Sequence, residues 1–145
     1  MNSWVCVDAN LVLKLLLREP DSYRAHSLWD SWLLNDCRIA APPLLPIEVT
    51  AVLRKSVYRG RIAARDGRNL LKKAPTLGVE ILNYDDLHER AWLLAEKLNR
   101  PTAYDAHYLA LAELLQCDFW TADRRLYNAA ATLPWVHSLD EITEG

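Results

Sequence analysis

Four carboxylates in this chain stand at positions where a charge is costly, and they are the residues best suited to do chemistry. Asp8 and Asp123 each close an apolar run, VCVD and FWTAD, directly before a stretch with helical character. Glu48 and Asp105 lie within helical stretches and have mainly apolar residues three and four positions away. Burying an unpaired charge costs on the order of several kcal/mol, and proteins relieve that cost with a raised pKa, an Arg or a metal ion.

Each of these acids, taken alone, also has an ordinary structural explanation. An Asp commonly opens a helix by accepting a hydrogen bond from the first turn, which would account for Asp8 and Asp123. Asp105 could be a first-turn acid that the helix dipole favours. Glu48 has no Lys or Arg at ion-pair spacing on its own helix, so only a distant Arg could neutralise it. The alternatives stay open for every single residue, and the functional hypothesis rests on the four acids converging.

A convergent set of four carboxylates would need protons or cations, because their charges repel one another. Hard divalent cations prefer oxygen ligands, and a water-rich site built from few carboxylates suits Mg²⁺ or Mn²⁺. Zn²⁺ is disfavoured because the chain has no pair of Cys or His at a useful spacing. Metal sites of the carboxylate kind activate water and neutralise phosphoryl charge, so the acids indicate hydrolysis of a phosphate ester.

The hydrophobic pattern predicts the strands and helices that carry these acids. Short apolar runs predict strands, at residues 3–7, 37–41, 79–82, 119–121 and 135–139. Apolar residues at helical spacing predict helices, at residues 11–17, 22–33, 47–60, 61–73, 87–98, 104–115 and 124–131. The prolines at 42–46 are expected to delay their helix until Ile47. Asp86 and Glu89 are spaced as a capping box for the helix predicted at residues 87–98.

Strands and helices alternate along the whole chain, which predicts right-handed crossovers and a mainly parallel sheet. We expect an α/β fold, a three-layer α/β/α sandwich with a central sheet of four to five strands. Asp8 and Asp123 would then lie at the carboxyl edge of the sheet. Ligands bind at that edge in open parallel sheets.

Composition restricts the class of protein. The chain has 145 residues, of which 51% are hydrophobic and 25% charged, and we expect a single domain over residues 1–145. The first residues, MNSWVCVDANLVLKLLL, lack a basic start and carry charges within the apolar stretch, so we expect neither a signal peptide nor a membrane span. A cytoplasmic location and reduced cysteines are the resulting expectations. The net charge of -2 indicates no particular partner.

Four segments together resemble the motifs of PIN-domain nucleases, in the same order and at similar spacing. They are VDAN at 7–10, PIEVTAVLRK at 46–55, YDAHYLALAE at 104–113 and WTADRRL at 120–126. More narrowly, the chain resembles the VapC-type toxins of toxin–antitoxin pairs, and the resemblance covers essentially the whole sequence. It implies a metal-dependent endoribonuclease on an α/β/α sandwich.

The resemblance also assigns roles to residues. The family's four acidic positions are matched by Asp8, Glu48, Asp105 and Asp123. As a hypothesis, we expect the three aspartates to hold one Mg²⁺ or Mn²⁺ directly or through water, and Glu48 to orient metal-bound water or to help recruit a second ion when RNA binds. Asn10 and Thr121 match positions that support the acids through hydrogen bonds. Attack by activated water in line with the leaving group would yield a 5′-phosphate and a 3′-hydroxyl. His107 matches no ligand of the family, so we expect a packing or surface residue.

A basic segment follows the helix of Glu48. Residues 54–73 hold eight of the chain's seventeen Lys and Arg residues and a single acid, Asp66. If this segment flanks the acids, its first members are candidates to guide the RNA backbone: Arg54, Lys55, Arg59 and Arg61. The alternative is a helical hairpin whose charges only face solvent. The resemblance further implies a VapB-like antitoxin as partner, a homodimer, and no membrane association.

Other readings of the acids place different demands on the sequence. A receiver-type switch needs adjacent acids after its first strand, and a dehalogenase-like phosphatase needs a DxD motif, whereas Asp8 opens the triplet DAN. The stronger alternative is a catalytically silent PIN-fold module that binds RNA or protein through its surface. The presence of all four acids in this chain counts against this alternative.

Overall fold

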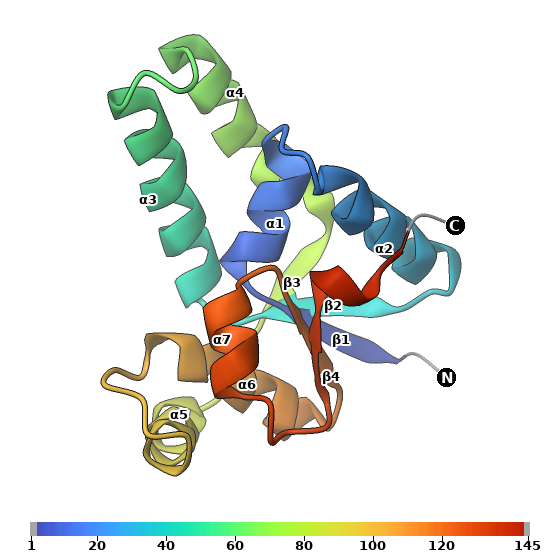
Figure 1. Cartoon of the computed structure of the whole chain (residues 1–145), viewed down its shortest axis with the longest axis vertical. Coiled ribbons are helices and arrows are strands. Elements are labelled where there is room, and N and C mark those ends of the chain that lie inside the picture. Colours follow the sequence, from blue (N-terminus) through green and yellow to red (C-terminus); the bar gives the residue numbers. More distant parts are fainter. Residues whose placement is uncertain (1–2, 144–145) are drawn as a thin grey trace.

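A parallel sheet of five strands, in the order β3-β2-β1-β4-β5, forms the middle layer within the described residues 3–143 of this computed structural model (Figure 1). The strands are β1 (Trp4–Val7), β2 (Arg38–Ala41), β3 (Val79–Ile81), β4 (Asp118–Thr121) and β5 (Val136–Ser138). All neighbouring strands run parallel. In the central pair, Val7 of β1 lies beside Trp120 of β4, so both strands end at the same edge. The expected parallel sheet is confirmed.

Helices cover both faces of this sheet. Those in the described part of the chain are α1 (Ala9–Leu16), α2 (Ser22–Leu34), α3 (Leu44–Tyr58), α4 (Ala64–Lys73), α5 (Leu87–Lys97), α6 (Tyr104–Leu115) and α7 (Arg124–Ala129). Figure 1 shows α1 and α2 on one side of the sheet and α5 and α6 on the other, which confirms the three-layer sandwich. Helices α3 and α4 form a hairpin that projects beyond the sheet. Between residues 3 and 143, no helix has the length and apolar character needed to cross a membrane.

The core lies on both faces of the two central strands. Val5, Cys6 and Val7 of β1 are all buried, as expected for a parallel strand that is covered on both sides. Phe119 of β4 packs beside Tyr108 of α6 with ring centres 6.4 Å apart, and both side chains are almost fully buried. Burying each ring contributes roughly 1.5–3 kcal/mol. This packing fixes the ends of β1 and β4 relative to α6, which carries Asp105.

Two local expectations were wrong. Helix α3 begins at Leu44, three residues before Ile47, because Pro46 occupies its first turn, where a backbone N–H has no partner within the helix. The capping box at α5 does not form, since Asp86 makes no side-chain capping bond. The Asp86 carboxylate instead accepts a hydrogen bond from Arg90 Nε at 3.1 Å. The three cysteines are free thiols, as expected.

Close packing at Gly67 holds the two helices of the α3–α4 hairpin together. A Cβ at Gly67 would lie 2.5 Å from Cγ2 of Val57, a stiff β-branched side chain of α3. The smallest residue therefore lets α4 approach α3. The basic segment of residues 54–73 depends on this approach for its position relative to the sheet.

We predict that Gly67→Ala lowers the thermal stability of the protein. The added methyl group overpacks the hairpin, which costs about 1–3 kcal/mol, and this outweighs the gain of about 1 kcal/mol from helix propensity. In a Val57→Ala background the clash is absent, so Gly67→Ala should there be neutral or stabilising. Thermal denaturation of the four proteins of this double-mutant cycle provides the measurement. An equal destabilisation in both backgrounds would contradict the packing explanation.

Candidate functional site

Asp8 and Asp123 occupy equivalent places at the carboxyl ends of neighbouring strands. Asp8 follows β1 and opens α1, and its Oδ1 accepts a hydrogen bond from Leu11 N at 2.9 Å. Asp123 follows β4 and opens α7, and its Oδ1 accepts from Arg125 N at 2.9 Å. Both acids therefore cap helices and also lie at the ligand-binding edge of the sheet. Helix capping and a place in the functional site are therefore compatible for both residues.

Thr121 joins these two acids through its hydroxyl group. Its Oγ1 donates a hydrogen bond to Oδ2 of Asp8 and accepts one from Asp123 N at 2.9 Å. Asp8 is 2% exposed and Thr121 is fully buried, so solvent does not compete for these bonds. The Asp8 carboxylate is thus held from both oxygens in one orientation.

The charges of three aspartates act on one another at this edge. Burial raises the pKa of Asp8 to about 7; the hydrogen bonds from Thr121 and Leu11 oppose the rise, and the charges of Asp123 and Asp105 add to it. The pKa of Asp105, in the first turn of α6, is also raised by burial and by the charge of Asp123. Arg100 partly offsets this effect, since its Nη2 lies 3.7 Å from Oδ2 of Asp105. Burial and the neighbouring carboxylates together disfavour ionisation of Asp8 and Asp105.

Glu48 reaches the same region from α3. Its Oε1 accepts a hydrogen bond of 2.5 Å from the hydroxyl group of Tyr108 in α6. Burial raises the pKa of Tyr108, and the charges of Glu48 and Asp8 raise it further, so the phenol stays protonated as a donor. Glu48 is only half-buried, and Ala51 and Val52 are exposed, contrary to the sequence-based expectation. The reason is that α3 projects from the sheet and leaves that side of the helix uncovered.

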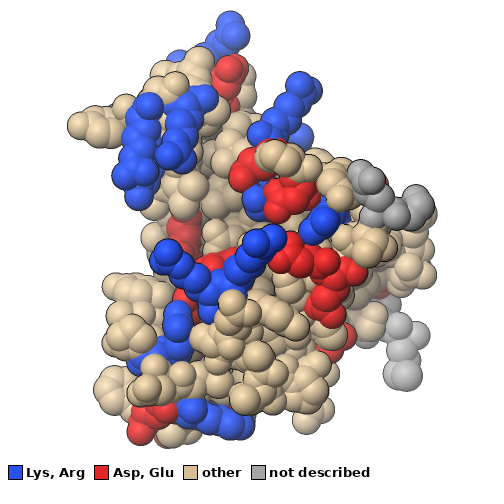
Figure 2. Space-filling view, viewed as in Figure 1, with Lys and Arg blue, Asp and Glu red and all other residues tan. Residues whose placement is uncertain are grey.

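The remaining predicted residues lie around this cluster at different distances. Asn10 is exposed on α1 and lines an open groove together with Asp123. The basic candidates Arg54, Lys55, Arg59 and Arg61 are exposed at the end of α3 and in the turn that follows. Figure 2 shows basic side chains over the α3–α4 hairpin and near the start of α7, with acidic side chains between them.

His107 lies apart from the acids, as expected. Its Nδ1 is 2.6 Å from the carbonyl oxygen of Ala103, and its Nε2 is 2.9 Å from Nδ1 of His88 on α5. This histidine pair connects α5 to α6. His107 is therefore a packing residue in this structure.

Sequence reasoning missed Tyr108 and Arg100 as parts of the site. Tyr108 stands one turn after Asp105, at a spacing that indicates a core-facing side chain. A buried Tyr hydroxyl needs a hydrogen-bond partner, and this was the available signal. Arg100 precedes Asp105 by five residues across a loop, and no helical spacing relates the two.

The donor set at this edge suits a divalent cation by its chemistry. Asp8, Asp105, Asp123 and Glu48 supply carboxylate oxygens. Burial is the main cause of the raised pKa of Asp8 and the charges of Asp123 and Asp105 add to it, and a bound cation would favour the ionised form against both. Within residues 3–143, however, no three His, Cys, Asp or Glu side chains are arranged ready to hold an ion. Binding would therefore require side-chain adjustment, most simply of the half-buried Glu48 and Asp105.

We predict that Asp8→Asn stabilises the metal-free protein, and that the gain depends on pH. In the folded protein the Asp8 carboxyl has a pKa of about 7, against an ordinary value of 3.8. The wild type therefore loses stability relative to the Asn variant as the pH rises from about 4 to about 7, by up to roughly 1.4 kcal/mol per pH unit. Below and above this window the difference no longer changes with pH. Thermal denaturation in EDTA from pH 4 to 8 measures this difference, and a pH-independent gap would contradict the burial of a charge at Asp8.

Comparisons with known proteins agree with this arrangement. The model of the PIN domain family matches residues 5–132. Ribonuclease VapC9 of Mycobacterium tuberculosis is 35% identical over 122 residues, which are 84% of this chain and 87% of the relative. The crystal structure of PAE2754 from Pyrobaculum aerophilum superposes with a TM-score of 0.69 at 22% identity, covering 97% of this chain and 94% of the other.

A second solved structure, a toxin–antitoxin complex from Klebsiella pneumoniae, contains a chain with the same fold. It superposes with a TM-score of 0.62 at 21% identity and covers 91% of this chain and 94% of that one. At these identities the two solved structures establish the fold, whereas the family model and VapC9 establish descent. With its parallel sheet and its acids at the carboxyl edge, the chain belongs to the PIN domain family and, within it, to the VapC group.

Proposed function

We propose that the protein is a VapC-type endoribonuclease that hydrolyses RNA phosphodiester bonds with water and depends on Mg²⁺ or Mn²⁺. The observation that carries the proposal is the buried Asp8 carboxylate, whose pKa is raised to about 7 beside Asp105 and Asp123. A buried carboxylate beside like charges destabilises the fold, so its presence at the ligand-binding edge favours a catalytic role. The identity to VapC ribonucleases supports the choice of RNA as substrate.

In this proposal Asp8, Asp105 and Asp123 hold the divalent cation. When bound, such an ion supplies water of lowered pKa and neutralises charge on the phosphoryl group. Glu48 is half-buried, and in this proposal it orients the attacking water by accepting its hydrogen bond. Tyr108 fixes one oxygen of Glu48 and leaves the other free for the water. The products are a 5′-phosphate and a 3′-hydroxyl.

Two further residues support these acids. Thr121 keeps Asp8 in one orientation and links it to the backbone of Asp123. Asn10 lies on the exposed first turn of α1, from which its amide can donate a hydrogen bond to a phosphate oxygen. The basic residues at the end of α3 attract the RNA backbone: Arg54, Lys55, Arg59 and Arg61.

A VapB-like antitoxin is the proposed protein partner, supported by the toxin–antitoxin complex from Klebsiella pneumoniae, which contains a chain of this fold. The antitoxin would place an Arg or Lys side chain among the acids. Within the chain, Arg100 already forms an ion pair of this kind with Asp105, with Nη2 and Oδ2 3.7 Å apart. The homodimer and the cytoplasmic location stay predictions.

The nuclease proposal is tested by incubating total RNA with the purified protein in Mg²⁺, Mn²⁺ or EDTA, beside Asp8→Asn prepared identically. We expect discrete fragments with 5′-phosphate ends only when metal is present, and a loss of about 100-fold or more in rate for the variant. Asp118→Asn is the matched control, because Asp118 is an exposed carboxylate at the opposite end of β4.

Two outcomes would count against this proposal. Fragments that end in a 2′,3′-cyclic phosphate would contradict attack by water. Equal behaviour of Asp8→Asn and wild type under all conditions would instead favour a silent PIN-fold binding module. In both cases the control variant Asp118→Asn has to behave like the wild type.

The hydrogen bond between Tyr108 and Glu48 makes a separate prediction for Tyr108→Phe. The ring remains in the core, but the hydroxyl group no longer fixes Glu48, so kcat should fall about tenfold while KM changes little. Glu48→Gln should lower kcat further, and Tyr108→Phe should add almost nothing in that background. Kinetics of the single and double variants test this coupling, and additive losses would contradict it.

A further inference from the structure

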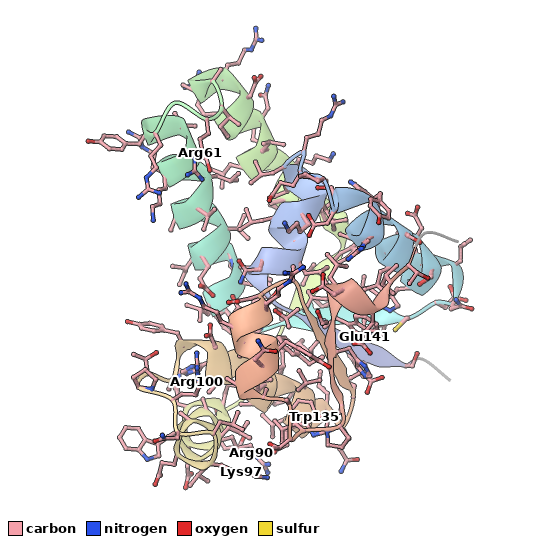
Figure 3. All side chains as sticks on the ribbon, in the orientation of Figure 1. Arg61, Arg90, Lys97, Arg100, Trp135 and Glu141 are labelled. Atoms are coloured by element: carbon pink, nitrogen blue, oxygen red, sulfur yellow. The ribbon has the colours of Figure 1, made fainter. Side chains whose placement is uncertain are left out.

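An open, polar groove lies beside the acid cluster and is not explained by the cluster itself. It has a volume of about 480 Å³ and runs between α1, α3 and the start of α7. Asp123 and Asn10 line it on the side of the acids. Arg61 reaches it from the turn after α3, and Arg124 and Arg125 reach it from the first turn of α7. Figure 3 labels Arg61 at the far end of α3. The arginines of the groove therefore come from two different elements, the turn after α3 and the first turn of α7.

The basic side chains of this groove differ in whether their charge is already neutralised. Lys14, on the α1 wall, lies 2.9 Å from Glu19 and 2.8 Å from Asp21. Arg124 donates from Nε to Asp140 at 2.8 Å. Arg61 and Arg125 form no ion pair within the described part of the chain, residues 3–143, and both are exposed. Two guanidinium groups are therefore available beside a cluster of acids.

We infer that this groove holds the RNA backbone next to the cleaved bond, and that Arg61 and Arg125 are positioning residues that bind its phosphates. The inference rests on the proposed nuclease function and deepens it. A guanidinium group presents a planar set of donors that matches two phosphate oxygens. The Asn10 amide adds a further donor to the lining of the groove. An anionic chain is favoured as the occupant because the groove leaves two cations, Arg61 and Arg125, without an ion-pair partner among residues 3–143.

This placement also divides the basic segment into two parts. Arg61 lines the groove, whereas the basic residues of α4 do not: Arg65, Arg68, Lys72 and Lys73. The RNA strand is thus expected to run between α3 and α7 and not along α4. Neutralising a residue of the groove should therefore cost more binding than neutralising a residue of α4 that has the same charge.

The test measures binding separately from cleavage. In an Asp8→Asn background, which binds RNA without cutting it, Arg61→Gln, Arg125→Gln and the double variant are titrated into fluorescently labelled single-stranded RNA and followed by anisotropy. We expect each substitution to weaken binding about five- to tenfold and to reduce the slope of log K against log salt by about 0.7, the value for one phosphate contact on a single strand. Arg65→Gln, an exposed arginine of α4, is the matched control and should change the affinity less than twofold.

A parallel measurement in the otherwise wild-type protein follows cleavage. The groove variants should raise KM and leave kcat nearly unchanged, because the arginines position the strand and do not touch the reacting atoms. Thermal denaturation confirms that each variant is folded. The substituted arginines are all exposed, so their replacement is not expected to disturb the core.

The outcomes separate the groove from the nuclease function. If the wild type cleaves RNA but the double variant binds and cleaves it like its parent, the groove assignment is wrong and the nuclease function stands. If the wild type neither cleaves nor binds RNA, both are wrong. If the groove variants keep their RNA affinity but lose affinity for the purified antitoxin, the groove is a protein-docking surface and the inference is overturned.

Discussion

The structure is organised around one unfavourable interaction, the burial of the Asp8 carboxylate next to two other acids. Two hydrogen bonds, from Leu11 N and Thr121 Oγ1, hold this carboxylate but do not compensate its loss of hydration, and its pKa remains raised to about 7. Hydrophobic packing elsewhere has to offset the cost. A buried group that repels its neighbours is retained when a ligand of opposite charge supplies the missing compensation.

The topology brings the acids together from distant parts of the chain. From β1 the chain first builds β2 and β3 on one side, and it returns through α5 and α6 to place β4 on the other side. The strand order therefore reverses between β1 and β4, and a crevice opens at the carboxyl ends of these two strands. Asp8 and Asp123 follow directly from this arrangement. Asp105 and Glu48 are added by α6 and α3, helices that are far apart in the sequence.

Much of this arrangement was predictable from local patterns, and the exceptions have physical causes. A strand followed by Asp and then by a helix predicted both edge acids, because the pattern is local and period-based. The start of α3 was missed because Pro46 lies in the first helical turn, where proline is tolerated. The surroundings of Glu48 were misjudged because helical spacing gives a face but does not say whether another element covers it. Contacts such as that between Arg100 and Asp105 depend on loop conformation, which the sequence pattern does not encode.

The acids of the site are held in place in two different ways, and the hydrogen bond between Tyr108 and Glu48 belongs to the second. Asp8 and Asp123 are attached to strand ends in the middle of the sheet, and their orientation is fixed by backbone and Thr121 contacts. Glu48 belongs to a hairpin that packs mainly on α1 and projects from the sandwich, and a single phenol ties it to α6. The site therefore has one side anchored in the sheet and a second side carried by the projecting hairpin, so the position of Glu48 depends on the packing of α3 and on Tyr108, and not on the strand ends.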